Sequence, residues 1–211
     1  GDSWRECAGS GVTEMGGSRD PRRKEAEVTD ENGWESDWDA LVARVGEEIE
    51  GGLQSNLTAV EDVERASIRR FCEPVEFDCP LHYDDDVARA HGYGGVIAPH
   101  SSITQTFVDP GLWSPGDPSV YTSADAHAQP VKAGSGDNPF ASLPGPDVSA
   151  GFATDVEIEY FQDVLIGDRL QMRGNKLLSC VPKETSVGRG AFMIFESNCY
   201  NQRGELVATM R

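Results

Sequence analysis

The spacing of hydrophobic residues changes along the chain. In the first half, apolar residues recur every three or four positions among charged ones, as in an amphipathic helix. This spacing predicts four helices, at about residues 38–45, 61–71, 84–91 and 101–107. In the second half, strands dominate: apolar and polar residues alternate at about residues 156–161, and further β-rich segments at about residues 170–172, 177–181, 191–200 and 206–210 are separated by turn residues. Helices followed by an antiparallel meander indicate an α+β protein.

Two segments lack either pattern. Residues 1–33 are rich in Gly, Ser, Asp, Glu and Arg and carry almost no large apolar side chains. Such a segment cannot bury enough apolar surface to offset its ordering entropy, so we expect a mobile N-terminal tail. Residues 109–151 are dominated by Pro, Gly, Ser, Asp and Ala. Long loops of this kind are often functional, and we expect a lid or part of a subunit interface within a single domain at residues 34–211.

Composition and net charge limit the kinds of ligand and partner that the protein is expected to bind. The formal net charge of −18 argues against nucleic acid or an anionic membrane surface, although a local basic patch could still hold an anionic ligand. The five cysteines are scattered and form no CxxC pair, so neither a disulfide framework nor a zinc site is indicated. The sequence shows no apolar run of about 20 residues and no signal-peptide core. We therefore expect a cytoplasmic protein with no metal and no cofactor.

The run GYGGVIAP, Gly92 to Pro99, is the most informative motif. Its three glycines permit backbone angles and close approaches that other residues avoid. Val96, Ile97 and Ala98 then form an apolar run, and Pro99 opens the next segment. A tight turn leading into an apolar segment suggests a buried helix wrapped by a larger element.

Four segments together resemble the N-terminal-type domain of the MaoC-like dehydratases. They are His82–Asp84, GYGGVIAP, residues 160–168, and GRGAF followed by YNQRGELVA, in that order between about residues 60 and 211. The resemblance implies a hot-dog fold, in which an antiparallel sheet wraps a central helix, here expected at residues 99–107. It also implies pairing with another hot-dog subunit, as a homo- or hetero-oligomer. The implied reaction is reversible addition of water to a 2-enoyl thioester, with the coenzyme A thioester as substrate.

The same resemblance points to a catalytic histidine. Active family members carry an Asp and a His in a pattern like D-x-N-P-L-H, whereas this chain reads EFDCPLH from Glu76 to His82. His82 therefore falls on the histidine position, and Phe77 occupies the position of the Asp. Asp78 lies one residue further on, and neighbouring residues of an extended segment point to opposite faces. Asp78 could act with His82 only through a bulge or a helical turn.

Three interpretations of this motif remain open. In the first, His82 pairs with Asp78 or Glu76 in an unusual catalytic dyad. In the second, the chain has lost its dyad and supports a catalytic partner in a heteromeric hydratase, enlarging the pocket for bulky acyl groups such as steroid side chains. In the third, the histidine is only structural and the chain carries no thioester chemistry. A hot-dog acyl-CoA thioesterase is a further alternative, which the order of the family segments disfavours.

Substrate-binding candidates lie on both sides of Pro99. Hydration requires hydrogen-bond donors at the thioester oxygen, and the amides of Gly94 and Gly95 could supply them. His100 and Ser101 begin the expected central helix, where free backbone amides could also receive an oxygen. Turn formation explains the glycines equally well, and a solvated helix start explains His100.

Overall fold

The computed structural model describes residues 33–49, 56–104, 106–121, 123–125, 127–131, 143–148 and 151–211. Residues 34–211 belong to one compact unit. The tail predicted for residues 1–33 lies outside the described residues apart from Gly33, and parts of the loop at 109–151 do so as well. The tail, the lid and the single domain therefore stay predictions.

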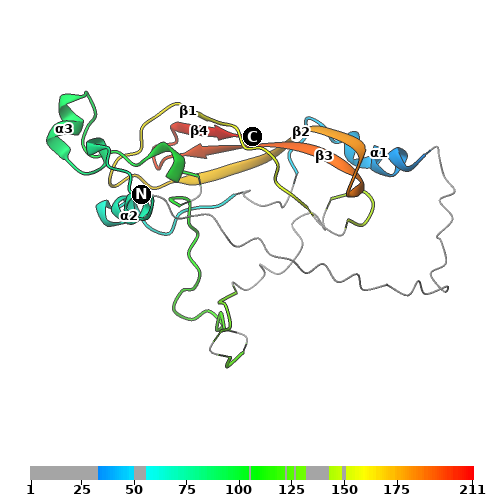
Figure 1. Cartoon of the computed structure of the whole chain (residues 1–211), viewed down its shortest axis with the longest axis horizontal. Coiled ribbons are helices and arrows are strands. Elements are labelled where there is room, and N and C mark those ends of the chain that lie inside the picture. Colours follow the sequence, from blue (N-terminus) through cyan, green and yellow to red (C-terminus); the bar gives the residue numbers. More distant parts are fainter. Residues whose placement is uncertain are drawn as a thin grey trace, which may run out of the picture. The chain divides into compact units, whose positions relative to one another are not determined.

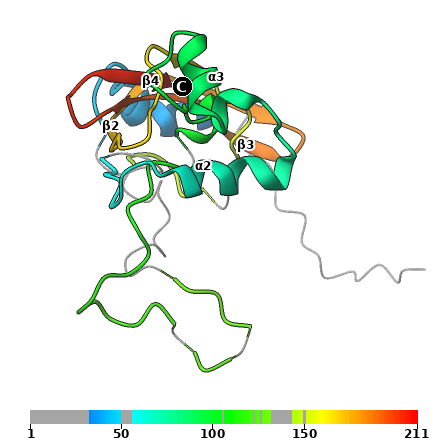
Figure 2. The same ribbon diagram turned by 90° about the vertical axis from the view of Figure 1, so that its left-hand side faces the viewer.

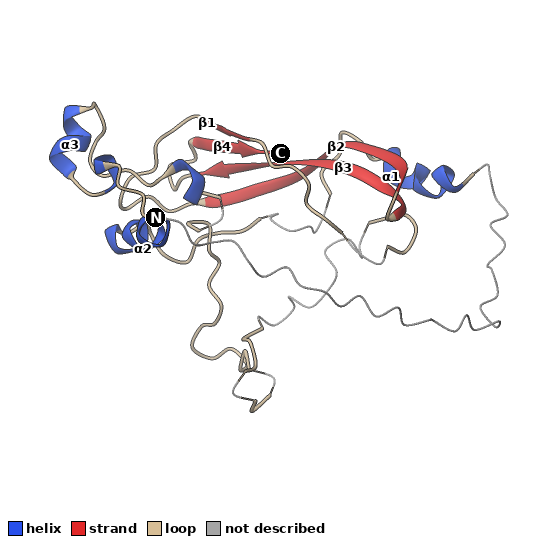
Figure 3. Cartoon of the chain, viewed as in Figure 1, coloured by secondary structure: helices blue, strands red, loops and turns tan. Residues whose placement is uncertain are grey.

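The strands form one antiparallel sheet in the order β1–β4–β3–β2 (Figure 3). Their bounds are β1 Ile158–Tyr160, β2 Gln171–Thr185, β3 Gly188–Tyr200 and β4 Leu206–Met210. β2 and β3 make a long hairpin in which Val181 lies opposite Phe192, and two register shifts interrupt the β2 side. The predicted strands are confirmed, except that the two runs at 170–172 and 177–181 belong to a single strand.

The helices are short. They are η1 Trp34–Trp38, α1 Asp39–Val42, α2 Arg65–Cys72, η2 Glu73–Val75, η3 Pro80–His82, α3 Asp85–Ala90 and η4 His100–Ser102, where η denotes a 3₁₀ helix. α2 starts later than predicted because Glu64 and Ser67 form a capping box there, which fixes a helix start. The Asp84 side chain accepts the first free amides of α3. Figure 1 shows α2 and α3 at one end of the sheet and α1 near the hairpin at the other, and Figure 2 views the molecule from the α2–α3 end.

The predicted helix at residues 101–107 is wrong in extent. Only the single 3₁₀ turn of η4 is present, followed by turns at the described residues after it. The Ser102 hydroxyl donates to the Pro99 carbonyl, and serine and threonine side chains that bond to nearby backbone disfavour regular helix. The segment is nevertheless buried, because Ser102 and Ile103 are fully covered and Phe107 is nearly so.

Two clusters of buried side chains cover one face of β3. The first surrounds the segment after Pro99 and includes Ile68, Val96, Ile103, Leu170, Met172, Cys199 and Val207. The second lies beneath the hairpin and includes Trp38, Leu41, Ile49, Leu177 and Cys180. On the opposite face of β3, Phe192 and Ile194 are about half exposed. Burying one face is typical of antiparallel sheets, and here that face holds the segment on which the candidate site is built.

Candidate functional site

A cavity of about 320 Å³ lies beside the motif residues. Its lining includes Phe77, Leu81, His82, Tyr93, His100 and Ser101, together with the segment 97–99. It thus brings together three of the predicted site residues, His82, His100 and Ser101, which come from η3 and η4. Asp78, Gly94 and Gly95 do not line it.

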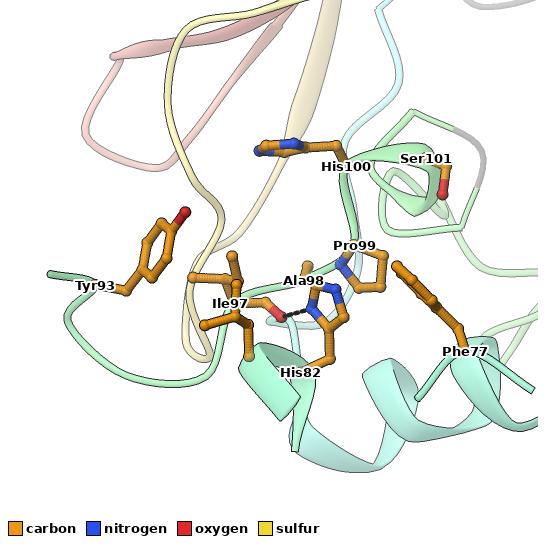
Figure 4. Close-up of a pocket in the computed structure, with 9 residues that line it drawn as sticks. Phe77, His82, Tyr93, Ile97, Ala98, Pro99, His100 and Ser101 are labelled. Carbon is orange, nitrogen blue, oxygen red and sulfur yellow. Dashed lines mark hydrogen bonds between the residues drawn. The ribbon is translucent and has the colours of Figure 1, made fainter. Parts of the chain in front are cut away.

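His82 lies at the floor of this cavity with one ring nitrogen already occupied. The residue is buried, and its Nδ1 lies 2.8 Å from the carbonyl oxygen of Ile97 (Figure 4). A carbonyl oxygen only accepts, so Nδ1 carries the proton in the neutral ring and Nε2 keeps its lone pair. His82 is therefore a fixed tautomer that can accept a hydrogen bond through Nε2.

An aromatic ring packs against this histidine where the motif of active family members has a carboxylate. The Phe77 ring centroid lies 5.0 Å from that of His82, with the planes tilted by 43°. The Phe77 amide donates to the Cys72 carbonyl, and the Tyr83 hydroxyl donates to the Phe77 carbonyl. These bonds hold the Phe77 backbone, so the residue keeps its place beside the imidazole.

The nearby carboxylates lie elsewhere. Asp78 and Glu76 are both exposed, and no aspartate or glutamate is among the described residues that line the cavity. Asp78 does not line the cavity, and the catalytic role predicted for it stays a prediction.

His100, at the rim, is the histidine that does have a carboxylate partner. Its Nε2 lies 3.3 Å from Oδ1 of Asp163, and its ring stacks on Tyr160 of β1 with centroids 4.7 Å apart. Both members of the pair are about half exposed. No sequence pattern indicated this pairing, because 63 positions separate the two residues and residues 160–168 stood out only as a family segment.

The glycines of GYGGVIAP are explained by close packing. A Cβ at Gly95 would lie 3.1 Å from an Asp85 carboxylate oxygen, and one at Gly94 would lie 3.2 Å from the Leu165 side chain. That carboxylate accepts the Val96 amide at 2.9 Å and pairs with Arg65. The Val96 amide, and then Arg65, lower the pKa of Asp85 below its usual value. The predicted role of the two glycine amides at a thioester oxygen stays a prediction.

Two other features are absent from the part of the chain that the structure describes. No group of three or more histidine, cysteine, aspartate or glutamate side chains there is arranged to hold a metal ion. Likewise, none of its helices has the length and apolar character that a membrane span requires.

Comparison with known proteins identifies the class. The family model of the FAS1-like dehydratase domain region matches residues 52–112 and 118–210, so the chain belongs to this family. A probable enoyl-CoA hydratase alpha subunit from Thermomonospora curvata is 28% identical over 144 residues, which are 68% of this chain and 41% of that protein. The chain therefore spans less than half the length of that relative.

The fold agrees with this class. A chain of the ChsH1–ChsH2 complex from Mycobacterium tuberculosis superposes with a TM-score of 0.56 at 25% identity, covering 83% of this chain and 88% of that one. The predicted α+β hot-dog fold and dehydratase family are confirmed, and the family is one of hydratases and dehydratases.

Proposed function

We propose that this chain is one hot-dog subunit of a heteromeric enoyl-CoA hydratase. Its cavity receives the acyl part of the thioester, and the carboxylate–histidine pair that activates water belongs to a second hot-dog subunit. The observation that carries this proposal is the contact between Phe77 and His82, in a cavity whose described lining has no carboxylate.

The chemistry explains why that contact matters. Addition of water to a conjugated thioester requires a base that activates the water and an acid that protonates the α-carbon. An imidazole packed against a phenyl ring, with no carboxylate in the described lining of its cavity, has no partner there to hold the water or to stabilise an imidazolium. His82 is then a binding residue, whose Nε2 accepts a hydrogen bond from a hydroxyl group or a water molecule in the cavity. A thioesterase that uses a carboxylate would also need one here.

The edge of β1 is the face we assign to the second subunit. Among the described residues, β1 pairs only with β4, so its other edge offers unpaired backbone groups, which favour addition of a strand. Val156 and Phe161, which flank β1, are 57% and 45% exposed. His100 stacks on Tyr160 of the same strand. A subunit docked at this edge would lie beside the cavity rim, where a shared substrate could reach both chains.

The substrate we propose is a 2-enoyl-CoA with a bulky acyl group, such as a steroid side chain. The cavity lies between the labelled side chains of Figure 4, and its described lining is mostly apolar apart from His82, His100, Ser101 and Tyr93. An apolar cleft with a few placed polar groups is typical of a small-molecule site.

A spectrophotometric assay tests the proposal. The chain is incubated with crotonyl-CoA and with an enoyl-CoA that carries a steroid side chain, alone and together with the hot-dog subunit that co-purifies with it. We expect loss of the enoyl absorbance only when both subunits are present, with a preference for the bulky substrate. Hydration by this chain alone would overturn the proposed division of roles, and release of free thiol would indicate a thioesterase instead.

A further inference from the structure

Asp168 is a buried carboxylate for which the proposed chemistry has no direct use. Only 3% of the residue is exposed. Its Oδ1 accepts from Nη1 of Arg203 at 2.9 Å and from Nε2 of Gln202 at 3.1 Å, and its Oδ2 accepts the amide of Leu165 at 2.9 Å. A buried charge with this many partners is costly to disturb, so the turn at Leu165 is firmly tied to the loop after β3.

That turn supports the floor of the cavity. Leu165 forms an isolated antiparallel bridge with Ile97, and the Ala98 amide donates to the Val164 carbonyl at 2.8 Å. The Ile97 carbonyl is the acceptor for Nδ1 of His82, and these contacts place it together with the bond from the Ile97 amide to the Leu81 carbonyl at 3.2 Å. A path of hydrogen bonds joined by short backbone segments therefore runs from the loop after β3 to the imidazole.

We propose that Asp168, held by Arg203, is a positioning residue that sets the tautomer of His82. If the turn opens, the Ile97 carbonyl moves and Nδ1 loses its acceptor. The neutral ring can then carry its proton on Nε2, which faces the cavity as a donor instead of an acceptor. The Asp168–Arg203 pair thereby determines whether His82 at the cavity floor binds a donor group or an acceptor group of a substrate. Its importance for hydration rests on the proposed function, whereas its effect on the tautomer does not.

Asp168→Asn is the informative substitution because an amide has only one acceptor oxygen. If that oxygen faces the Leu165 amide, the NH₂ group faces the Arg203 and Gln202 donors. If it faces those donors, the NH₂ group meets the Leu165 amide. In either orientation, the side chain keeps its volume but loses its hydrogen bonds on one side, either to the Leu165 amide or to Arg203 and Gln202.

The readout is the protonation pattern of the His82 ring, measured by long-range ¹H–¹⁵N correlation on the whole chain. The chain has 4 histidines, so His82 can be assigned by comparison with His82→Gln. We expect the Nδ1–H form to predominate in the unaltered chain and to fall below half in Asp168→Asn. An unchanged His82 tautomer in a folded Asp168→Asn chain would overturn the proposal.

Arg169→Gln is the matched control. Arg169 is the next residue and also forms an ion pair, through Nε to Asp62 at 2.7 Å, but both side chains are about half exposed. Its loss should leave the His82 tautomer unchanged. An equal change in Arg169→Gln would mean that any weakening of this region has the same effect, which contradicts a specific role for Asp168.

Two further measurements cover the case in which Asp168→Asn does not fold. Arg203→Gln removes the ion pair between Arg203 and Asp168 and should shift the His82 tautomer in the same direction. In the unaltered chain, hydrogen exchange of the Leu165 and Ala98 amides should proceed through one shared opening with equal protection. Clearly different protection would show that the turn and the floor open independently and would overturn the proposal.

A tautomer change without any hydratase activity in the assembled complex would leave this inference standing and reject the proposed function.

Discussion

The floor and the rim of the cavity each carry a histidine, and the two histidines have opposite surroundings. At the floor, His82 is buried, bonded to a neutral carbonyl and packed against Phe77. At the rim, His100 is half exposed and lies beside the Asp163 carboxylate. The histidine predicted to occupy the family's catalytic position thus has no carboxylate beside it in the described cavity lining, whereas the histidine with a carboxylate lies outside that motif. The motif position alone therefore does not define a catalytic group, because the groups around the ring decide its chemistry.

Solvent access distinguishes the His100–Asp163 pair at the rim from the floor. A carboxylate in place of Phe77, which is 40% exposed, would lose part of its hydration beside the buried His82, and such a loss requires compensating hydrogen bonds. At the rim, water can hydrate both members of the pair, so the pair can form without a large desolvation penalty. The exchange of a carboxylate for Phe77 is compatible with a floor that binds the acyl group.

Phe77→Asp should produce the largest change in this comparison. The substitution places a carboxylate next to His82, which restores the residue types of the family's acid–base pair. We expect hydration of crotonyl-CoA by the isolated chain to rise by roughly 10²-fold or more, the low end for a positioned acid–base group. Phe192→Asp is the control, since Phe192 is 47% exposed and Phe77 is 40% exposed. A folded but inactive Phe77→Asp chain would show that more than a carboxylate separates the floor from a working site.

His100→Gln should have the next largest effect. We expect KM for the enoyl-CoA to rise about tenfold in the assembled complex with little change in kcat, the loss expected for one charge-assisted hydrogen bond. Asp163→Asn should reproduce part of this effect because Asp163 orients the ring. If neither variant alters KM, the rim pair does not contact the substrate.

His82→Ala should affect the complex less than removal of a catalytic base would. We expect kcat to fall by less than the roughly 10²-fold that marks a general acid–base group, since the proposed catalytic pair is on the other subunit. The measurement is steady-state kinetics of the complex with the bulky enoyl-CoA. A larger loss of kcat would place His82 in the chemistry and favour a composite active site.

The smallest expected effect concerns how the stability that Asp85 contributes to the fold depends on pH. Because the folded-state pKa of Asp85 is lowered by the Val96 amide, its stabilisation is complete above the unfolded value of about 3.9 and is lost as pH falls through the lower folded value. Asp85→Asn should therefore lower Tm by a few degrees at pH 7, and the difference should shrink toward pH 3. Asp86, whose side chain is 98% exposed, is the control, since Asp86→Asn should follow the unaltered chain at every pH. A constant difference for Asp85→Asn would contradict this linkage.

Much of the fold could be predicted from local patterns. The β-rich runs at residues 191–200 and 206–210 predicted β3 and β4. The acidic, helix-prone stretch at residues 84–91 indicated α3. The helix at residues 101–107 could not be predicted correctly, because its apolar spacing favours a helix whereas the Ser102 hydroxyl bonds to the backbone instead. Periodicity measures which residues are buried, and it does not distinguish a buried helix from buried turns.

For the candidate site as well, some features could be predicted from the sequence and others depend on the tertiary structure. The sequence by itself predicted that His82 lies in the family's histidine position and that Phe77 replaces the acid, because both are positions in a local motif. Only the tertiary structure decided that Ile97 fixes the proton on His82, that Asp163 meets His100, and that Asp168 supports the cavity floor. Each of these contacts joins residues far apart in the chain, and their distances depend on how the sheet, the turns and the buried segment pack together.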